Sequence, residues 1–223
     1  MKQKRGVRRK TKTIILHVLS LFLAVLFGTT SAYYVTSKGI ENMLLTKGAE
    51  VYMQEYFSPS DLWLPGETKT KDVYFGNRND SDQVIRFTVE MGWYDNKGTP
   101  ANLSDDTPWS YTGTYTPAPA VINWTNEVVG GSATWTKIGN YYYYNKVLQK
   151  QSGTTPTVTP SVISSVTFSP ALSNDGIHAE DFSNKACKIT IKMEALHVNT
   201  EFAEAEWAVK FVARGSDLTW TPT

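Results

Sequence analysis

The clearest hydrophobic pattern in this chain is an alternation that runs from Val84 to Trp93. Every second residue is large and apolar, whereas three of the four residues between them are polar. The apolar set is Ile85, Phe87, Val89, Met91 and Trp93. A period of two is typical of a strand with one buried face and one solvent-exposed face. The pattern therefore predicts a strand that contributes one face to a hydrophobic core.

The residues before this strand predict a second strand that precedes it. Leu-Pro-Gly-Glu at 64–67 has the chemistry of a turn, and the β-prone run 68–75 follows it. Residues 76–82 are almost entirely Gly, Asn, Asp and Ser, which favour a loop. A turn, a strand, a polar loop and a strand in this order predict the first half of a β-sandwich.

Further short runs rich in β-branched and aromatic residues predict more strands. They cover residues 49–56, 121–124, 135–138, 141–144, 162–168 and 187–193. Gly139 and Asn140 separate two of these runs, which predicts a hairpin whose two-residue turn has a positive φ. The alternation of the last run becomes irregular at Ala195 and Leu196, which indicates a bulge or a strand end.

The C-terminal residues allow two interpretations. Thr200 as an N-cap, followed by Ala203, Trp207 and Phe211 at a spacing of four, predicts a short helix within 200–214. Alternation of Trp207, Val209 and Phe211 predicts instead a final strand over 206–212. Residues 215–223 are expected to form a frayed tail.

The N-terminus predicts a secretory signal. Seven basic residues and no acidic residue occur in 1–32, where an apolar run at 14–27 precedes small residues at 30–32. The run is short for a membrane span, which needs about 20 apolar residues. We expect cleavage between Ala32 and Tyr33, and the alternative is an uncut signal anchor. No second apolar span follows, so the membrane would be contacted only through this segment.

Charge and cysteine content narrow the functional classes. The formal net charge is +1, but without the seven N-terminal bases the chain has 15 basic and 21 acidic residues. An acidic body does not favour nucleic-acid binding, which requires clustered bases. The single cysteine, Cys187, cannot form an internal disulfide. Its place in an alternating run favours a small buried side chain over a reactive or intermolecular thiol.

Residues 99–120 predict a long surface loop rich in Thr, Ser, Pro and Asp. One interpretation is a binding loop, and the other is a variable loop whose aromatic side chains lie on the sandwich. Aromatic side chains in a loop can also stack on sugars. The candidate surface aromatics are Trp109, Tyr111, Tyr115 and Trp124.

Patterns typical of enzyme active sites are absent from the sequence. It contains no His-Glu-x-x-His pair, no Gly-x-Ser-x-Gly elbow and no phosphate-binding loop. His178 with Asp181 and His197 with Glu194 could supply a distant metal site, but lone histidines near turns are usually surface residues. We therefore predict a protein that is not an enzyme and has no catalytic, cofactor-binding or metal-binding residues.

Four segments together resemble the exported biofilm-matrix proteins of Gram-positive bacteria, the TasA, camelysin and BsaA group. Residues 28–34, Gly-Thr-Thr-Ser-Ala-Tyr-Tyr, are similar to the signal junction of that group. Trp63-x-Pro-Gly, Val73-x-Phe-x-Asn and Ile85-Arg-Phe follow in the order of the family. Residues 139–148 resemble its Gly-Tyr-Tyr-Tyr-Tyr-x-x-x-Leu segment, and residues 189–195 resemble its Ile-x-Val-x-Ala-Glu-Ala segment. The BsaA-like branch fits best, although residues 196–198 depart from the family pattern and residues 99–120 do not align.

The resemblance implies a jelly-roll-like antiparallel β-sandwich over residues 48–214 and cleavage by a signal peptidase of the ER type. It also implies a secreted subunit, in the extracellular matrix or at the cell surface, that assembles with copies of itself into fibres. In the family, a segment near the mature N-terminus completes the sheet of the next subunit. The counterpart here is residues 33–47, which begin with Tyr33, Tyr34 and Val35. The alternatives are a camelysin-like metalloendopeptidase and an adhesin or carbohydrate-binding sandwich.

Overall fold

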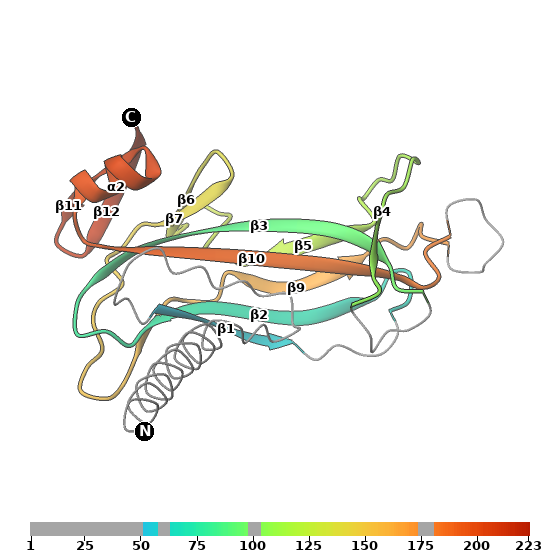
Figure 1. Cartoon of the computed structure of the whole chain (residues 1–223), viewed down its shortest axis with the longest axis horizontal. Helices are drawn as coiled ribbons and strands as arrows, with labels where there is room; N and C mark the ends of the chain where they lie inside the picture. The colour runs from blue at the N-terminus through green and yellow to red at the C-terminus, as the bar shows by residue number, and fades with distance from the viewer. Residues whose placement is uncertain (1–50, 58–62, 98–103, 174–180) are drawn as a thin grey trace, which may run out of the picture. The chain divides into compact units, whose positions relative to one another are not determined.

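A computed structural model describes residues 51–57, 63–97, 104–173 and 181–223. Within these ranges the chain is an antiparallel β-sandwich with one short helix, as the alternation patterns predict (Figure 1). The first sheet has the order β1 (Val51–Phe57), β2 (Thr68–Asn77), β9 (Ile163–Phe168), β5 (Ala120–Trp124), and β8 (Thr157–Val158) also pairs with β2. The second sheet has the order β10 (Lys185–His197), β3 (Gln83–Asp95), β7 (Tyr141–Tyr144), β6 (Trp135–Ile138), and β4 (Thr107–Trp109) also pairs with β3.

The main core lies between the two sheets. Its largest fully buried side chains include Phe75 of β2 and Phe87 of β3, whose ring centroids are 5.1 Å apart. Trp135 of β6 contacts both rings edge-on, at 5.6 and 4.8 Å. Aromatic pairs of this kind add to the stabilisation that comes from burying their apolar area. The alternating residues of the predicted strands therefore form the contact between the sheets.

Two tight turns form where the sequence predicts them. The amide of Glu67 donates to the carbonyl of Leu64 over 3.0 Å, and Gly66 has a φ of 82°. Proline followed by glycine at a positive φ is typical of a type II turn. Gly139 has a φ of 60° between the paired residues Ile138 and Tyr141, which fits a two-residue hairpin with glycine first.

The β3–β10 ladder is the longest pairing in the described chain. Each strand has 13 residues, and the register is unbroken from Lys185–Asp95 to His197–Gln83. Ala195 and Leu196 are both buried within it. The bulge or strand end predicted there is therefore wrong. The alternation is lost because Ala195 packs in the main core while Leu196 packs in a second core on the opposite face.

This second core is built by the C-terminal residues. It contains α2 (Thr200–Trp207) and the hairpin of β11 (Val209–Arg214) and β12 (Asp217–Pro222), so a helix and a strand both occur where the sequence left them as alternatives. The N-cap is Asn199 rather than Thr200, because the Asn199 side chain accepts from the amides of Glu201 and Phe202. Thr200 instead accepts from the amide of Phe211.

The prediction of a frayed tail at 215–223 is wrong. Leu218 and Trp220 of β12 are buried, and the Trp220 indole Nε1 donates to the carbonyl of Tyr144 over 2.8 Å. Strand β12 pairs with β11 along its whole length. The two buried side chains alternate with exposed ones. Two apolar residues in so short a strand are too few to give a distinct pattern in the sequence.

A buried ion pair lies in the second sheet where the C-terminal unit covers it. Arg86 of β3 and Glu194 of β10 are paired opposite each other and are 7% and 8% exposed. The Arg86 Nε donates to Glu194 Oε2 over 2.7 Å, and its Nη1 donates to the Tyr143 hydroxyl over 3.0 Å. The guanidinium also lies 4.6 Å from the centroid of the Trp207 ring. The positive charge is thus neutralised in a site where aromatic rings exclude water.

We predict that Glu194→Gln destabilises the fold by about 3–5 kcal/mol, because it leaves the Arg86 charge buried without a counter-ion. Urea unfolding followed by tryptophan fluorescence measures this change. Glu90→Gln is the matched control, since Glu90 lies on the same ladder and pairs with Lys192 at the surface over 3.3 Å. It should cost less than about 1 kcal/mol. Equal losses in the two variants would show that the buried pair has no special role.

Candidate functional site

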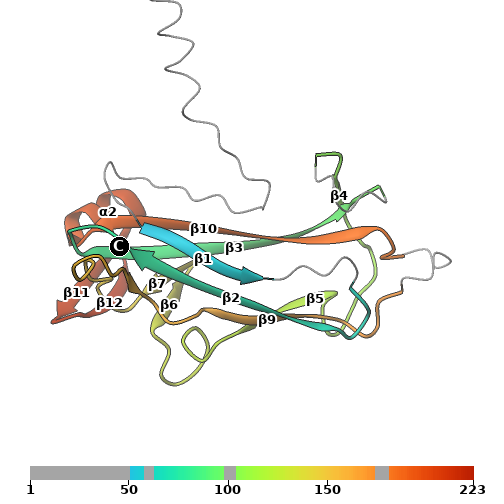
Figure 2. The ribbon, with the colours of Figure 1, turned by 90° about the horizontal axis from the view of Figure 1, so that it is seen from below.

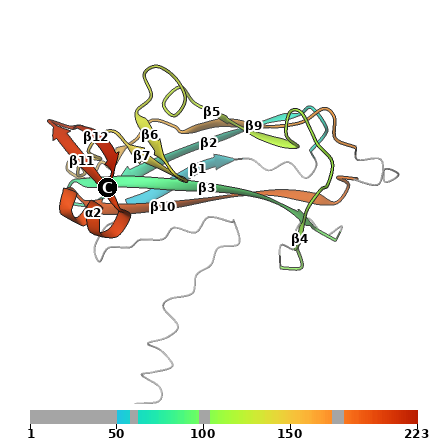
Figure 3. The same ribbon diagram turned by 90° about the horizontal axis from the view of Figure 1, so that it is seen from above.

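The strand edges of the sandwich are its most extended candidate functional surface. Within the described residues, β1 and β10 each pair with a strand on one side only. Both strands lie along the same long side of the sandwich, at the upper side of the sheets in Figure 2 and at their lower side in Figure 3. An edge strand presents backbone N–H and C=O groups that another strand can pair with.

The hairpin register identifies which backbone groups of β10 face outward. Ile138 and Tyr141 flank a two-residue turn and bond to each other, so Tyr142 directs its N–H and C=O toward Phe87 of β3. Directions alternate along an antiparallel strand, so Thr88, Glu90 and Gly92 direct theirs toward β10. Their partners on β10 are Lys192, Thr190 and Lys188.

The residues between these partners therefore direct their backbone groups away from β3. These residues are Cys187, Ile189, Ile191, Met193 and Ala195. Their side chains belong to the inward-facing set of the strand, and Ile191 and Met193 are almost fully buried. The outward backbone groups thus belong to residues whose side chains anchor in the core.

Lysine side chains accompany this edge. Lys185, Lys188 and Lys192 all belong to β10, and Lys192 pairs with Glu90 on the outer face of the sheet. Lysines on edge strands oppose unselective pairing, because an approaching strand must accommodate their charge. The edge therefore favours a partner strand whose charges are opposite in sign to those of the lysines.

The aromatic residues of the long loop gather into one cluster. Trp109, Tyr111 and Tyr115 all pack around Phe182, with ring centroids 4.9, 6.0 and 5.7 Å from it. Trp93 of β3 joins this third core. The rings are half-buried. This part of the loop therefore agrees with the second interpretation given above, in which the aromatic side chains lie on the sandwich. The loop also contains the strand β4, which the sequence patterns did not predict. Its three residues, Thr-Pro-Trp, are too few to show an alternation.

Trp124 lies apart from these three residues. It belongs to β5 and contacts Phe87 and Tyr142, with ring centroids 6.2 and 5.0 Å away. The four candidate surface aromatics of the sequence therefore do not form one continuous platform. The N-terminal candidates Ala32, Tyr33, Tyr34 and Val35 lie outside the described residues.

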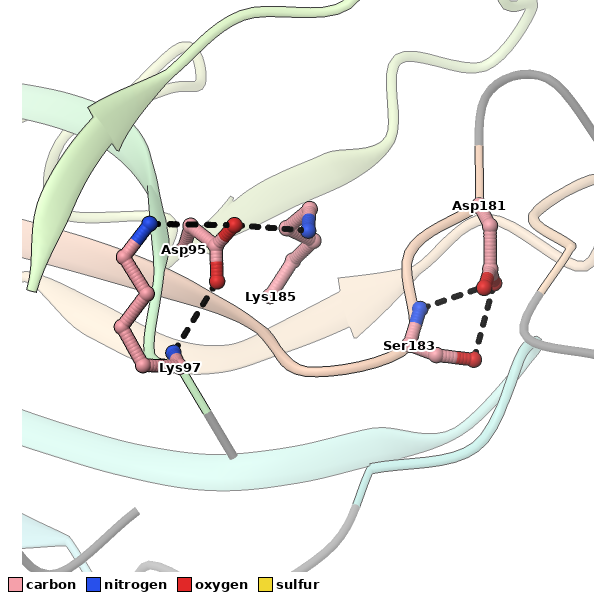
Figure 4. A network of polar contacts seen from close by, with 5 residues as sticks. All are labelled: Asp95, Lys97, Asp181, Ser183 and Lys185. Atoms are coloured by element: carbon pink, nitrogen blue, oxygen red, sulfur yellow. Dashed lines mark hydrogen bonds and ion pairs between the residues drawn. The ribbon is translucent and has the colours of Figure 1, made fainter. Parts of the chain in front are cut away.

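A polar network closes the far end of the β3–β10 ladder (Figure 4). Asp95 accepts from the backbone amide of Lys97 over 2.9 Å and pairs with Lys185 over 3.3 Å. The hydrogen bond from the Lys97 amide lowers the pKa of the Asp95 carboxyl, and Lys185 lowers it further. Asp181 accepts from the amide and hydroxyl of Ser183, over 2.9 and 2.8 Å. Both carboxylates accept hydrogen bonds from residues of the turns at the strand ends. Their role is therefore structural.

The candidate metal residues do not come together in the part of the chain that the structure describes. His197 is exposed, and its Nδ1 lies 3.3 Å from the Gln83 side-chain amide, while Glu194 is committed to Arg86. His178 lies outside the described residues. In those that are described, no group of three or more His, Cys, Asp or Glu side chains could hold a metal ion. None of the described helices has the length and apolar content to cross a membrane.

Comparisons with known proteins found no family model, no curated protein and no solved structure that matches this chain.

Cys187 should be unreactive in the folded protein. Cys187 is half-buried, and this burial raises the pKa of its thiol to about 12. At pH 8 this lowers the thiolate fraction by about 10³-fold, and the thiolate is the reactive form. We predict that iodoacetamide labels Cys187 about 10³ times more slowly in the native protein than in urea. Labelling at equal rates would contradict the predicted burial.

Proposed function

We propose that this chain is a secreted structural subunit of an extracellular biofilm-matrix fibre, which assembles with copies of itself by β-strand addition. The N-terminal signal pattern supports export, and the four family-like segments support the matrix role. In this proposal a signal peptidase removes residues 1–32, and no reacting side chain takes part in the function.

The observation that carries the proposal is the edge of β10. Cys187, Ile189, Ile191 and Met193 direct backbone donors and acceptors outward along it, and no described strand pairs with the outer side of β10. Main-chain hydrogen bonds supply affinity in such pairings, and alternate side chains supply selectivity. A repeated pairing of one edge with a segment of the next copy is a head-to-tail contact, which produces filaments when the rotation does not close.

The proposed donor is the segment 33–47, beginning with Tyr33, Tyr34 and Val35. It follows the expected cleavage point directly, so it becomes the N-terminus of the mature chain. An extended segment of 15 residues reaches about 50 Å, at roughly 3.3 Å per residue. This is long enough to span the 13 residues of β10 in a neighbouring copy.

The two other functions considered from the sequence receive less support. A metalloendopeptidase needs ligands that converge, and Glu194 is already bonded to Arg86. A sugar-binding surface needs exposed rings in a row, whereas Trp109 and Tyr115 pack edge-on against Phe182 and Tyr111 packs against it at a tilt. We therefore propose the structural function alone.

Deleting residues 33–47 from the mature chain should abolish fibres and leave a folded monomer, because the donor is lost while the sandwich stays intact. Negative-stain electron microscopy and sedimentation measure this for chains 33–223 and 48–223. A chain 33–223 with residues 33–47 in shuffled order is the control for segment length. Fibres formed by chain 48–223 would show that another segment is the donor.

A second prediction separates the edge from the donor. Ile189→Pro removes one outward N–H of β10, whereas Ile189→Ala shortens the same side chain and keeps the N–H. The lost hydrogen bond is worth about 1 kcal/mol, so Ile189→Pro should raise the critical concentration for assembly roughly five-fold over Ile189→Ala. Circular dichroism must first show that both variants are folded. Equal critical concentrations would exclude this edge as the acceptor.

A further inference from the structure

Strand β3 has an unpaired interval in the middle of its sheet. On the side away from β10 it pairs with β7 at Arg86, Phe87 and Thr88 and with β4 from Trp93 to Asp95. No described strand pairs with residues 89–92 on that side. Because backbone directions alternate from Phe87, Val89 and Met91 direct their N–H and C=O groups into this interval. The Thr88–Tyr141 pairing directs the Val89 N–H toward the Asn140 carbonyl. Among the described residues, none of the backbone hydrogen bonds outside the strand ladders involves the Val89 C=O or the Met91 N–H and C=O.

A pocket of about 370 Å³ lies at the same interval. Val89 and Met91 line it from β3, and Ile122 and Trp124 line it from β5 of the facing sheet. Met91 is 42% exposed although it belongs to the inward-facing set of β3. The pocket is therefore an opening into the space between the two sheets, and it exposes apolar wall beside unpaired backbone. Its volume lies within the range of sites that hold small ligands or peptide side chains.

The rim of this opening carries a cation that is not neutralised. Lys137 of β6 lines the pocket, and its ammonium lies 5.2 Å from the centroid of the Tyr142 ring. No carboxylate in the described part of the chain forms an ion pair with it. Glu90, the carboxylate on the same rim, is already paired with Lys192 over 3.3 Å. The rim therefore favours an occupant with a negative charge.

We infer that this opening binds an extended acidic peptide as an inserted strand between β7 and β4. The peptide backbone pairs with the Val89 C=O and with the Met91 N–H and C=O, which completes the second sheet. Two apolar side chains at alternate positions enter the pocket against Trp124 and Ile122. A carboxylate beside them pairs with Lys137. Unpaired backbone donors and acceptors in register select a polypeptide, because a sugar or a lipid cannot match their spacing. This inference does not rest on fibre assembly and concerns an interval distinct from the β10 edge.

Two proline variants test the geometry before any ligand is added. Met91→Pro removes an N–H that faces the opening, so the fold should keep the unfolding midpoint of Met91→Ala. Glu90→Pro removes an N–H that bonds to β10 and should lower the midpoint clearly or prevent folding. Equal effects of the two variants, in either direction, would overturn the backbone assignment on which the site rests.

Binding is tested with chain 48–223 labelled with ¹⁵N, which also removes the proposed fibre donor. The probe is a pool of heptapeptides that begin and end with glutamate and alternate threonine with Val, Leu, Phe or Tyr. We expect saturable shifts of the Val89 and Met91 amides. Met91→Pro should bind at least ten-fold more weakly than Met91→Leu, and Lys137→Gln should weaken binding a few-fold. A peptide of residues 33–47 and cellohexaose are added separately.

Each outcome decides the inference. Peptide binding that is lost in Met91→Pro supports it, and tighter binding of the 33–47 peptide would identify the partner as a second copy of this chain. Binding of cellohexaose alone, no saturable peptide binding by the unmutated chain, or equal affinity of Met91→Pro and Met91→Leu would overturn it. Fibre formation by chain 33–223 is measured independently, so failure of one proposal does not imply failure of the other.

Discussion

The structure depends on the long antiparallel pairing of β3 with β10. This ladder supplies the second sheet with its inward-facing side chains, among them Phe87 and Met193, and so forms one wall of the main core. At one end the outer face of the same ladder is buried as well, by Trp207 and its neighbours. A ladder with two buried faces has little freedom to slip in register, because a shift by one residue would exchange the two sets of side chains.

The ion pair of Arg86 and Glu194 follows from this double burial. Both residues belong to the outer face, which in a simple sandwich would contact water. Here the helix and the C-terminal hairpin cover them, and the charges are tolerated because they bond to each other and to Tyr143. The C-terminal unit contributes the Trp207 ring, which lies 4.6 Å from the guanidinium and helps to shield the pair from water.

Sequence patterns predicted the strands with one buried face well, and they failed where burial departs from that rule. The alternation from Val84 to Trp93 and the Gly139 turn are read directly from local chemistry. The regularity fails at Ala195 and Leu196 because a second core lies on the other face. Strand β12 was missed because Leu218 and Trp220 are buried by segments distant in sequence, which local patterns do not contain. The short strand β4 has too few residues for any period.

The candidate site, too, was predicted from the sequence only in part. The resemblance and the targeting pattern suggested an edge-pairing protein, and the prediction of aromatic side chains on a loop located Trp109, Tyr111 and Tyr115. Which backbone groups face outward depends on hydrogen-bond direction, and this required the register of β7 against β3. The opening beside Val89 and Met91 was not predictable, because it results from the ends of two other strands. Unpaired backbone is a property of the arrangement in space, and no residue type marks it.

The central claim is that β10 pairs with another copy through its outward backbone groups. Residue-resolved hydrogen exchange of the Ile189, Ile191 and Met193 amides, compared between monomer and assembled chain 33–223, tests it most directly. The account predicts that these three amides exchange rapidly in the monomer and become protected on assembly, while Thr190 and Lys192 are protected in both states. Assembled material in which Ile189, Ile191 and Met193 still exchange as fast as in the monomer would contradict it.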